Sequence, residues 1–252
     1  MTARVPALMM LLVLASGGCG HEDSARVRTF AQLPNWKGIW IADDGYMSTL
    51  GLSGFSEQKN LNRSLVVLNG KAPFRPEWAP KVAAFRAAYA NAPGKECGFY
   101  FPQVMESPWM FQFLITPEET ALIFGGREIR HIYTDGRKHL DEDSIWATPW
   151  GDSIGHWEGG TLVVDTIAVQ PARMPLGPLL SEKAHFTERI RMPAPGRIED
   201  QLTIEDPVAL TKAWTVTVPY KLTALDRLMH GDCQENDRNP IIDGKLTIAP
   251  GH

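Results

Sequence analysis

The fold of this chain is decided by the stretch Trp150-Gly-Asp-Ser-Ile-Gly-His-Trp-Glu-Gly-Gly-Thr-Leu-Val-Val-Asp-Thr166. Alternating side chains flank Gly159-Gly160, and glycine tolerates the positive φ angles that a tight turn requires. Alternation with a period of two is typical of strands, so the stretch predicts a β-hairpin. The turn residues are either Glu158-Gly159 or Gly159-Gly160. Both choices keep the same parity of strand pairing, so the same side chains share a face.

The two faces of this hairpin differ in character. One face is core-like and carries Ser153, Gly155, Trp157, Leu162, Val164 and Thr166. The other is mixed and carries Asp152, Ile154, His156, Thr161, Val163 and Asp165. A mixed face fits either the solvated outside of a sheet or the lining of a polar cavity. The hairpin alone leaves both alternatives open.

The rest of the chain after residue 109 continues the period of two. Leu33–Trp40 is predicted to lead into a first strand. Later candidate strands are Met110–Thr116, Thr120–Phe124, Ile129–Thr134, Ser153–Trp157, Leu162–Thr166, His185–Met192, Arg197–Glu205, Trp214–Leu222 and Lys245–Ile248. Short turns without interleaved helices predict an antiparallel meander. Closure removes exposed edges, so we expect a mainly β fold that closes into a lipocalin-like β-barrel or a curved sheet.

One segment has helical spacing instead. Apolar and aromatic side chains recur every three or four residues among alanines, at Trp78, Val82, Phe85 and Tyr89. This spacing predicts one amphipathic helix over Glu77–Ala92. We expect it to pack across an opening or a side of the barrel.

The beginning of the chain has the features of an export signal. Arg4 precedes an apolar run from Ala7 to Ala15, and small residues lead to Cys19. Residues 1–19 are therefore predicted as a signal peptide, with residues 20–252 as one domain. The apolar run is too short for a membrane-spanning helix. Two alternatives stay open: Cys19 is acylated and tethers the protein to a membrane, or the signal is simply removed. The expected location is the periplasm or the cell envelope.

The remaining cysteines, Cys97 and Cys233, are an even pair in a chain predicted to reach an oxidising compartment. We expect a disulfide between them, and two buried free thiols are the alternative. The net charge of -4 and the lack of a basic run argue against a nucleic-acid partner.

Candidate residues for chemistry begin with Glu188, which alternates with Phe186 and Ile190 and so faces the predicted core. A carboxylate among apolar side chains must be paired, hydrogen-bonded or protonated, and the protonated form suits proton transfer. An interior salt bridge is the alternative. Asp200 is a second carboxylate on an apolar strand face.

We expect Glu188, His156 and Asp165 to line one cavity as acid, base and orienting carboxylate, with Tyr133 as the next member. A competing arrangement places the face of Trp157, Leu162 and Val164 inside and leaves only Glu188 there. A metal site built from His131, His139, His156 and Asp165 has no established ligand spacing to support it, so no metal or other cofactor is predicted.

These features predict an exported protein that binds a small, largely apolar or aromatic molecule in a barrel cavity. The expected activity is cofactor-independent acid–base chemistry, such as elimination, isomerisation, hydration or hydrolysis. A non-catalytic carrier is the alternative, and a structural envelope protein without a cavity is a third. Inward-pointing charged groups would favour an enzyme, because a carrier of an apolar molecule has little use for desolvated carboxylates.

The chain also resembles a family of secreted bacterial proteins, most of them of unknown function. The motifs in order are Arg130 to Gly136, the hairpin Ser153-x-Gly-x-Trp-Glu-Gly-x-Thr-Leu-Val-Val-Asp-Thr166, Thr187-Glu-Arg189, Thr203-Ile-Glu-Asp-Pro207 and Cys233-Gln-Glu-Asn236. The resemblance spans about Pro76 to Asn236. This chain departs from the family at Gly160, where an acidic residue is usual, and in the spacing of Trp150 to Gly151. The resemblance implies export and a mostly β fold, and it assigns no active-site residues.

Overall fold

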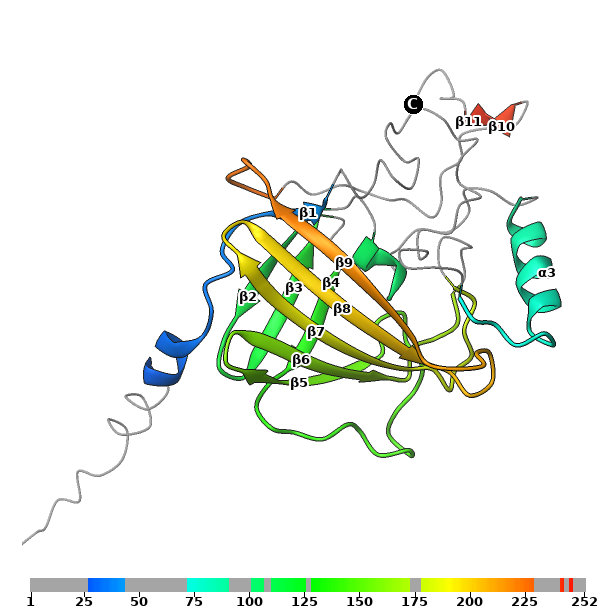
Figure 1. Ribbon diagram of the computed structural model, residues 1–252, viewed down its shortest axis with the longest axis horizontal. Helices are drawn as coiled ribbons and strands as arrows, with labels where there is room; N and C mark the ends of the chain where they lie inside the picture. The colour runs from blue at the N-terminus through cyan, green and yellow to red at the C-terminus, as the bar shows by residue number, and fades with distance from the viewer. Residues whose placement is uncertain are drawn as a thin grey trace, which may run out of the picture.

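The computed structural model describes residues 27–43, 72–90, 101–106, 110–125, 128–172, 178–228, 241–242 and 245–246. Within them, nine strands form a closed barrel in which each strand pairs with the next along the chain (Figure 1). The barrel strands are β1 (Trp40–Ala42), β2 (Phe111–Ile115), β3 (Glu119–Phe124), β4 (Ile129–Tyr133), β5 (Asp152–Glu158), β6 (Thr161–Ile167), β7 (His185–Ala194), β8 (Arg197–Glu205) and β9 (Trp214–Leu222). Strand β1 closes the barrel by pairing with β2 and β9. The predicted mainly β barrel is confirmed.

The hairpin is formed by β5 and β6, with Gly159-Gly160 as its loop and Glu158 paired with Thr161. Gly159 takes a φ of 59°, the left-handed conformation that glycine tolerates. The core-like face points into the barrel, because Ser153, Leu162, Val164 and Thr166 are buried. The mixed face is therefore the outside of the barrel.

One strand pair differs from the predicted meander. Strands β4 and β5 are parallel, with Tyr133 opposite Ile154, whereas the other barrel pairs are antiparallel. Parallel neighbours require a connection that returns the chain to the same end of the sheet. Residues 134–151 make this connection outside the barrel wall (Figure 1). A short turn could not join β4 to β5, because the two strands are parallel.

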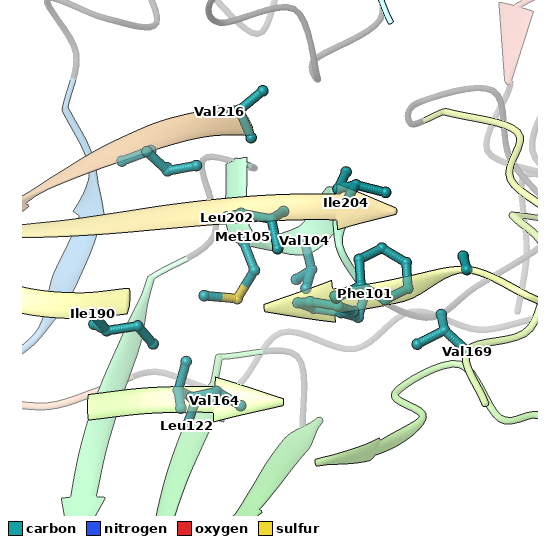
Figure 2. Packing of buried hydrophobic residues seen from close by; sticks show 14 of the residues in the cluster. Phe101, Val104, Met105, Leu122, Val164, Val169, Ile190, Leu202, Ile204 and Val216 are labelled. Atoms are coloured by element: carbon teal, nitrogen blue, oxygen red, sulfur yellow. The ribbon is translucent and has the colours of Figure 1, made fainter. Parts of the chain in front are cut away.

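The barrel interior is filled by side chains from the strands and from one inserted segment. Residues 101–106, which include the 3₁₀ helix η2 (Gln103–Glu106), place Phe101, Val104 and Met105 in the core (Figure 2). We call residues 101–106 the plug. Elsewhere in the core, the Trp36 ring packs edge-on against Phe113 and Trp157, at centroid distances of 5.0 and 5.2 Å.

The predicted helix is present as α3 (Ala79–Ala90), to one side of the barrel (Figure 1). Trp78, just before it, is buried and donates a hydrogen bond from Nε1 to the carbonyl oxygen of Leu179 at 2.8 Å. Val82 is buried one turn later. Residues 27–32 are also helical, and no helix among the described residues is long and apolar enough to cross a membrane.

Several predictions fall on other parts of the chain. The signal segment 1–19 and all three cysteines, Cys19, Cys97 and Cys233, lie outside the described residues. The predicted last strand corresponds to β11 (Lys245–Leu246), which pairs with β10 (Ile241–Ile242) in a separate sheet.

A side chain at Gly151, the residue just before β5, is expected to destabilise the protein. Its φ is 68°, and a Cβ atom there would lie 2.5 Å from the carbonyl oxygen of Ile167 and 2.7 Å from Val169 Cγ2. Gly136 is a matched control, because its φ is 83° but a Cβ atom would meet nothing within 4 Å.

Gly136→Ala should lower the free energy of unfolding by about 1–2 kcal/mol for the backbone conformation alone. Gly151→Ala should cost about 1–3 kcal/mol more for the clash. Urea unfolding of both variants measures this difference, and equal losses would contradict the packing described for Gly151.

Candidate functional site

The centre of the barrel holds a buried ion pair between Arg130 on β4 and Glu188 on β7. Both side chains are fully buried, and the guanidinium meets the carboxylate in a two-pronged contact. Nη1 donates to Oε1 at 2.8 Å, and Nη2 donates to Oε2. Strands β5 and β6 separate β4 from β7 in the wall, so the pair reaches across the interior. This is the interior salt bridge that the sequence left as an alternative for Glu188.

The hairpin supplies two hydroxyl groups to the same guanidinium. Nη2 of Arg130 lies 3.1 Å from Thr166 Oγ1 and 3.4 Å from Ser153 Oγ, and the two hydroxyls lie 2.8 Å from each other. Thr166 and Ser153 lie on the core-like hairpin face. Their contacts with Arg130 explain why this face contains polar residues. Nε of Arg130 has no hydrogen-bond partner among the described residues.

Asp200 on β8 is the unsatisfied member of this interior. It is fully buried, and neither of its carboxyl oxygens accepts a hydrogen bond from the described residues. Glu188 pairs with Leu202, two residues from Asp200, so the two carboxyl groups are diagonal neighbours on the inner face. Burial raises the pKa of Asp200 well above its usual range, and the charge of Glu188 raises it further, while Arg130 opposes this. A proton on Asp200 can be donated to Glu188, which also raises the pKa of Asp200.

The plug covers the Arg130 side of this polar centre. The ring of Phe101 lies 4.0 Å from the guanidinium carbon of Arg130, and Met105 Sδ lies 3.9 Å from Nη1. The Tyr220 hydroxyl donates to the carbonyl oxygen of Met105 at 2.7 Å and fixes the plug to β9. In Figure 2, Met105 and Val104 lie between the side chains of β8 and those of the opposite wall. The plug therefore fills the barrel interior next to Arg130.

A small pocket lies beside the plug, with room for about one water molecule. Its walls include Phe101, Gln103, Val169, Leu180, Ala184 and Phe186. Phe101 and Phe186 also pack edge-on at a centroid distance of 5.0 Å. The pocket therefore lies against the same phenyl ring that covers the guanidinium.

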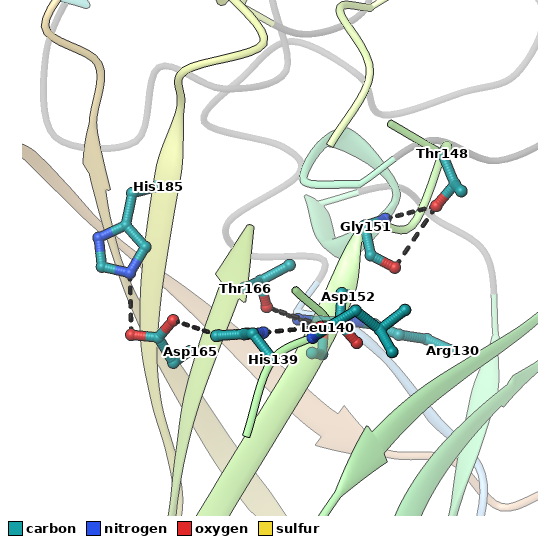
Figure 3. Close-up of polar contacts among 10 residues, drawn as sticks. Arg130, His139, Leu140, Thr148, Gly151, Asp152, Asp165, Thr166 and His185 are labelled. Atoms are coloured by element: carbon teal, nitrogen blue, oxygen red, sulfur yellow. Dashed lines mark hydrogen bonds and ion pairs between the residues drawn. The ribbon is translucent and has the colours of Figure 1, made fainter. Parts of the chain in front are cut away.

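A second polar cluster lies on the outside of the barrel (Figure 3). His139, from the connection 134–151, has one ring nitrogen 2.8 Å from Asp152 Oδ2 and the other 2.8 Å from Asp165 Oδ1. Asp165 Oδ2 lies 2.8 Å from Nε2 of His185, whose Nδ1 lies 3.5 Å from Glu205. An imidazole can donate from both nitrogens only when it is doubly protonated. This outer cluster of carboxylates and imidazoles attaches the connection 134–151 to the barrel wall.

The prediction that Glu188, His156 and Asp165 line one cavity is wrong. Glu188 is fully buried, whereas the side chain of His156 is 64% exposed and contacts Glu158 at 3.2 Å. Asp165 lies on the outside with His139 and His185. The hairpin face with the larger apolar side chains gains more from burial, so the mixed face is turned outward.

Tyr133 also lies outside the barrel, away from the interior ion pair. Its ring stacks on His131 at 6.3 Å and lies under the guanidinium of Arg137 at 4.0 Å. His131 contacts Glu119. Of the four side chains considered as metal ligands, only His139 and Asp165 are in hydrogen-bond contact. No group of three or more histidine, cysteine or acidic residues in the described part of the chain is arranged to hold a metal ion.

The interior residues that the sequence reasoning missed are Arg130, Ser153 and Thr166. A signal for Arg130 was present, because alternation on β4 places it on the same face as Ile132, and both are fully buried. A cation on an apolar strand face needs an acid on another inward face, and Glu188 meets that need.

Comparisons of the chain with models of known protein families, with curated protein sequences and with solved structures find no significant match. The resemblance to a family of secreted bacterial proteins therefore stays a prediction.

Proposed function

We propose that this protein binds one small, largely apolar molecule inside its barrel and acts on it by proton transfer at Asp200 and Glu188. The observation that carries the proposal is the polar centre beneath the plug. It contains a buried acid that accepts no hydrogen bond from the described residues, beside a buried carboxylate. Buried polar groups are normally satisfied, and an exception calls for an explanation such as a catalytic role or an absent occupant.

Asp200 and Glu188 have different environments, which suits them to different roles. Arg130 and the hairpin hydroxyls hold Glu188 and its partner in place. The raised pKa of Asp200 keeps a proton available on it over a wider pH range. An acid that retains its proton beside a carboxylate held by a guanidinium is an arrangement that suits general acid–base catalysis.

A bound molecule would replace part of the plug. The Tyr220 hydroxyl holds the plug through the backbone oxygen of Met105. The side chains of the plug can therefore move aside while this hydrogen bond is kept. The walls around the polar centre are apolar and would supply affinity. A non-catalytic carrier remains the second candidate, because the apolar walls serve it equally well.

Binding is tested with N-phenyl-1-naphthylamine, a neutral dye that brightens in apolar surroundings. We expect one dye molecule per chain and a several-fold higher affinity for Met105→Ala, which opens space above Arg130. Met192→Ala is the matched control, because Met192 is at the surface whereas Met105 is 1% exposed. Dye binding that is equal in the wild type and both variants, or absent from all three, would contradict a site under the plug.

Catalysis is tested with compounds that displace the dye, followed for turnover by NMR. If Asp200→Asn still binds such a compound but no longer converts it, the enzyme is supported. If no displacing compound is converted by the wild type, the carrier is supported instead.

We also propose export, on the basis of the signal-like residues 1–19. Either Cys19 carries a lipid anchor or the signal is simply removed.

We further propose a disulfide between Cys97 and Cys233. Protein isolated from the cell envelope should gain no label from a thiol reagent until it is reduced, and should then gain two labels, apart from Cys19. Intact mass measures this result and also shows whether Cys19 carries an acyl group. Two thiols that are labelled without reduction would refute the disulfide.

A further inference from the structure

We propose that the molecule taken up by the barrel is an amine, whose protonated nitrogen binds the Asp200 carboxylate while its apolar body replaces plug side chains. This inference rests on the binding function proposed above. It assigns the chemical class of the ligand, which that proposal leaves open.

The first argument is the balance of charge inside the barrel. The buried Asp, Glu, Lys and Arg side chains among the described residues are Arg130, Glu188, Asp200 and Asp206. Arg130 is committed to Glu188 and to the hairpin hydroxyls. One cation therefore faces two acids at the centre, so the charges balance only while Asp200 keeps its proton. A ligand cation would let Asp200 ionise without leaving an unpaired negative charge in the barrel.

The second argument is the contrast with Asp206, which shows how this chain satisfies a buried acid. Asp206 accepts hydrogen bonds from the backbone and hydroxyl of Ser181 at 2.7 and 2.9 Å. It also accepts from the backbone nitrogens of Val208 and Ala209, each at 2.9 Å. Asp200 has none of these donors, although it is equally enclosed. Once Asp200 has lost its proton, its carboxylate accepts hydrogen bonds only, so the group that then satisfies it must be a donor.

The third argument is the shape of the surroundings. On the inner face, Asp200 is flanked along β8 by Ile198 and Leu202, and it lies opposite Ile190 on β7 and Val218 on β9. All four of these side chains are buried. A single donor on an apolar body fits this environment. A ligand carboxylate does not, because it would place a third negative charge beside Glu188.

The proton balance follows from the protonated state of free Asp200. When an ammonium ion binds, the O–H bond of the Asp200 carboxyl group breaks and its proton passes to the buffer. When a neutral amine binds, the same proton passes to the amine nitrogen, where an N–H bond forms. Both routes end in the same ion pair, and neither needs another reactant.

The test compares benzylamine, benzyl alcohol and benzoate, which have similar bodies and different polar groups, by titration calorimetry. We expect benzylamine to bind the wild type at least about tenfold more tightly than the other two, because a charged hydrogen bond adds to the shared apolar contacts. Asp200→Asn should reduce this preference to about twofold or less. Glu205→Gln, which removes a 59% exposed carboxylate from the same strand, should leave it unchanged.

A second measurement uses the wild type alone and so does not depend on the folding of a variant. At about pH 5, above the usual pKa of an aspartate, benzylamine should release up to one proton per molecule bound. Titrations in two buffers of different ionisation enthalpy measure this release, which should disappear for benzyl alcohol.

The outcomes separate the two proposals. If benzyl alcohol or benzoate binds as tightly as benzylamine, or if benzylamine releases no proton, the amine assignment fails and the binding function stands. If the preference persists in Asp200→Asn, Asp200 is not the amine site. If none of the three probes binds at millimolar concentration and the neutral dye also fails to bind, both proposals fail. If the dye binds but the probes do not, only the amine assignment fails.

Discussion

Replacing Arg130 by methionine is expected to lower the free energy of unfolding by about 3–5 kcal/mol, because it leaves the Glu188 carboxylate buried without a cation. Glu188 is fully buried, so water cannot take the place of the guanidinium. The two hairpin hydroxyls would also lose a hydrogen-bond donor. Urea unfolding at neutral pH measures the loss.

Two controls isolate the ion pair. The double variant Arg130→Met, Glu188→Leu removes both charges and should recover most of the lost stability, as buried pairs replaced by apolar side chains often do. Arg189→Met breaks the Arg189–Glu158 pair, whose side chains are about half exposed at 47% and 49%, and should cost less than about 1 kcal/mol. If the double variant loses as much stability as Arg130→Met alone plus Glu188→Leu alone, the two charges do not act as a pair.

The second large effect concerns pH. Burial and the charge of Glu188 raise the pKa of Asp200 in the folded protein, so the folded state keeps a proton that the unfolded chain loses above about pH 4. The unfolded state then binds fewer protons, and the free energy of unfolding falls as pH rises, by about 1.4 kcal/mol per pH unit for this group. The fall ends once the pH exceeds the raised pKa.

Asp200→Asn has no such titration, so its stability relative to the wild type should rise with pH across this window. Carboxyl groups that do not interact with Asp200 titrate in the same way in both proteins and cancel in the difference. Urea unfolding of the two proteins from about pH 4 upward measures it. Glu205→Gln serves as the control, because this neighbouring carboxylate is mostly exposed. Parallel stability curves for the wild type and Asp200→Asn would mean that Asp200 ionises in the folded protein as it does in the unfolded chain.

Much of the barrel could be predicted because strand alternation is a local property. The pattern of β7 placed Glu188 inward with Phe186 and Ile190, and all three are buried. The same rule placed Asp200 inward on β8. In both cases one side of the strand was apolar enough to determine which side faced the core.

The hairpin shows where this reasoning fails. The locations of His156 and Asp165 depended on which of two faces was buried, and the pattern within the hairpin did not decide it. The larger area of Trp157, Leu162 and Val164 decided it in the folded protein. The parallel pairing of β4 with β5 was missed for a related reason, since the connection 134–151 contains too little regular pattern to show its path.

The plug was also beyond local reasoning. Phe101 and Met105 belong to a segment without strand alternation, and their burial depends on distant partners such as Arg130 and Tyr220. Periodicity describes which side of an element is buried. It does not describe which irregular segment fills the space that the elements enclose.

Closure of the barrel by β1 has a consequence for how the chain folds. Trp40 pairs with both Phe111 and Leu222, and β1 therefore joins the two ends of the strand order through contacts that are distant in sequence. Contacts of high sequence separation form late, because the entropy of closing a long loop must be overcome first. Until β1 is seated, the edges of β2 and β9 remain unpaired and open to strands of other chains. The yield of refolded protein should therefore fall as the protein concentration during refolding rises.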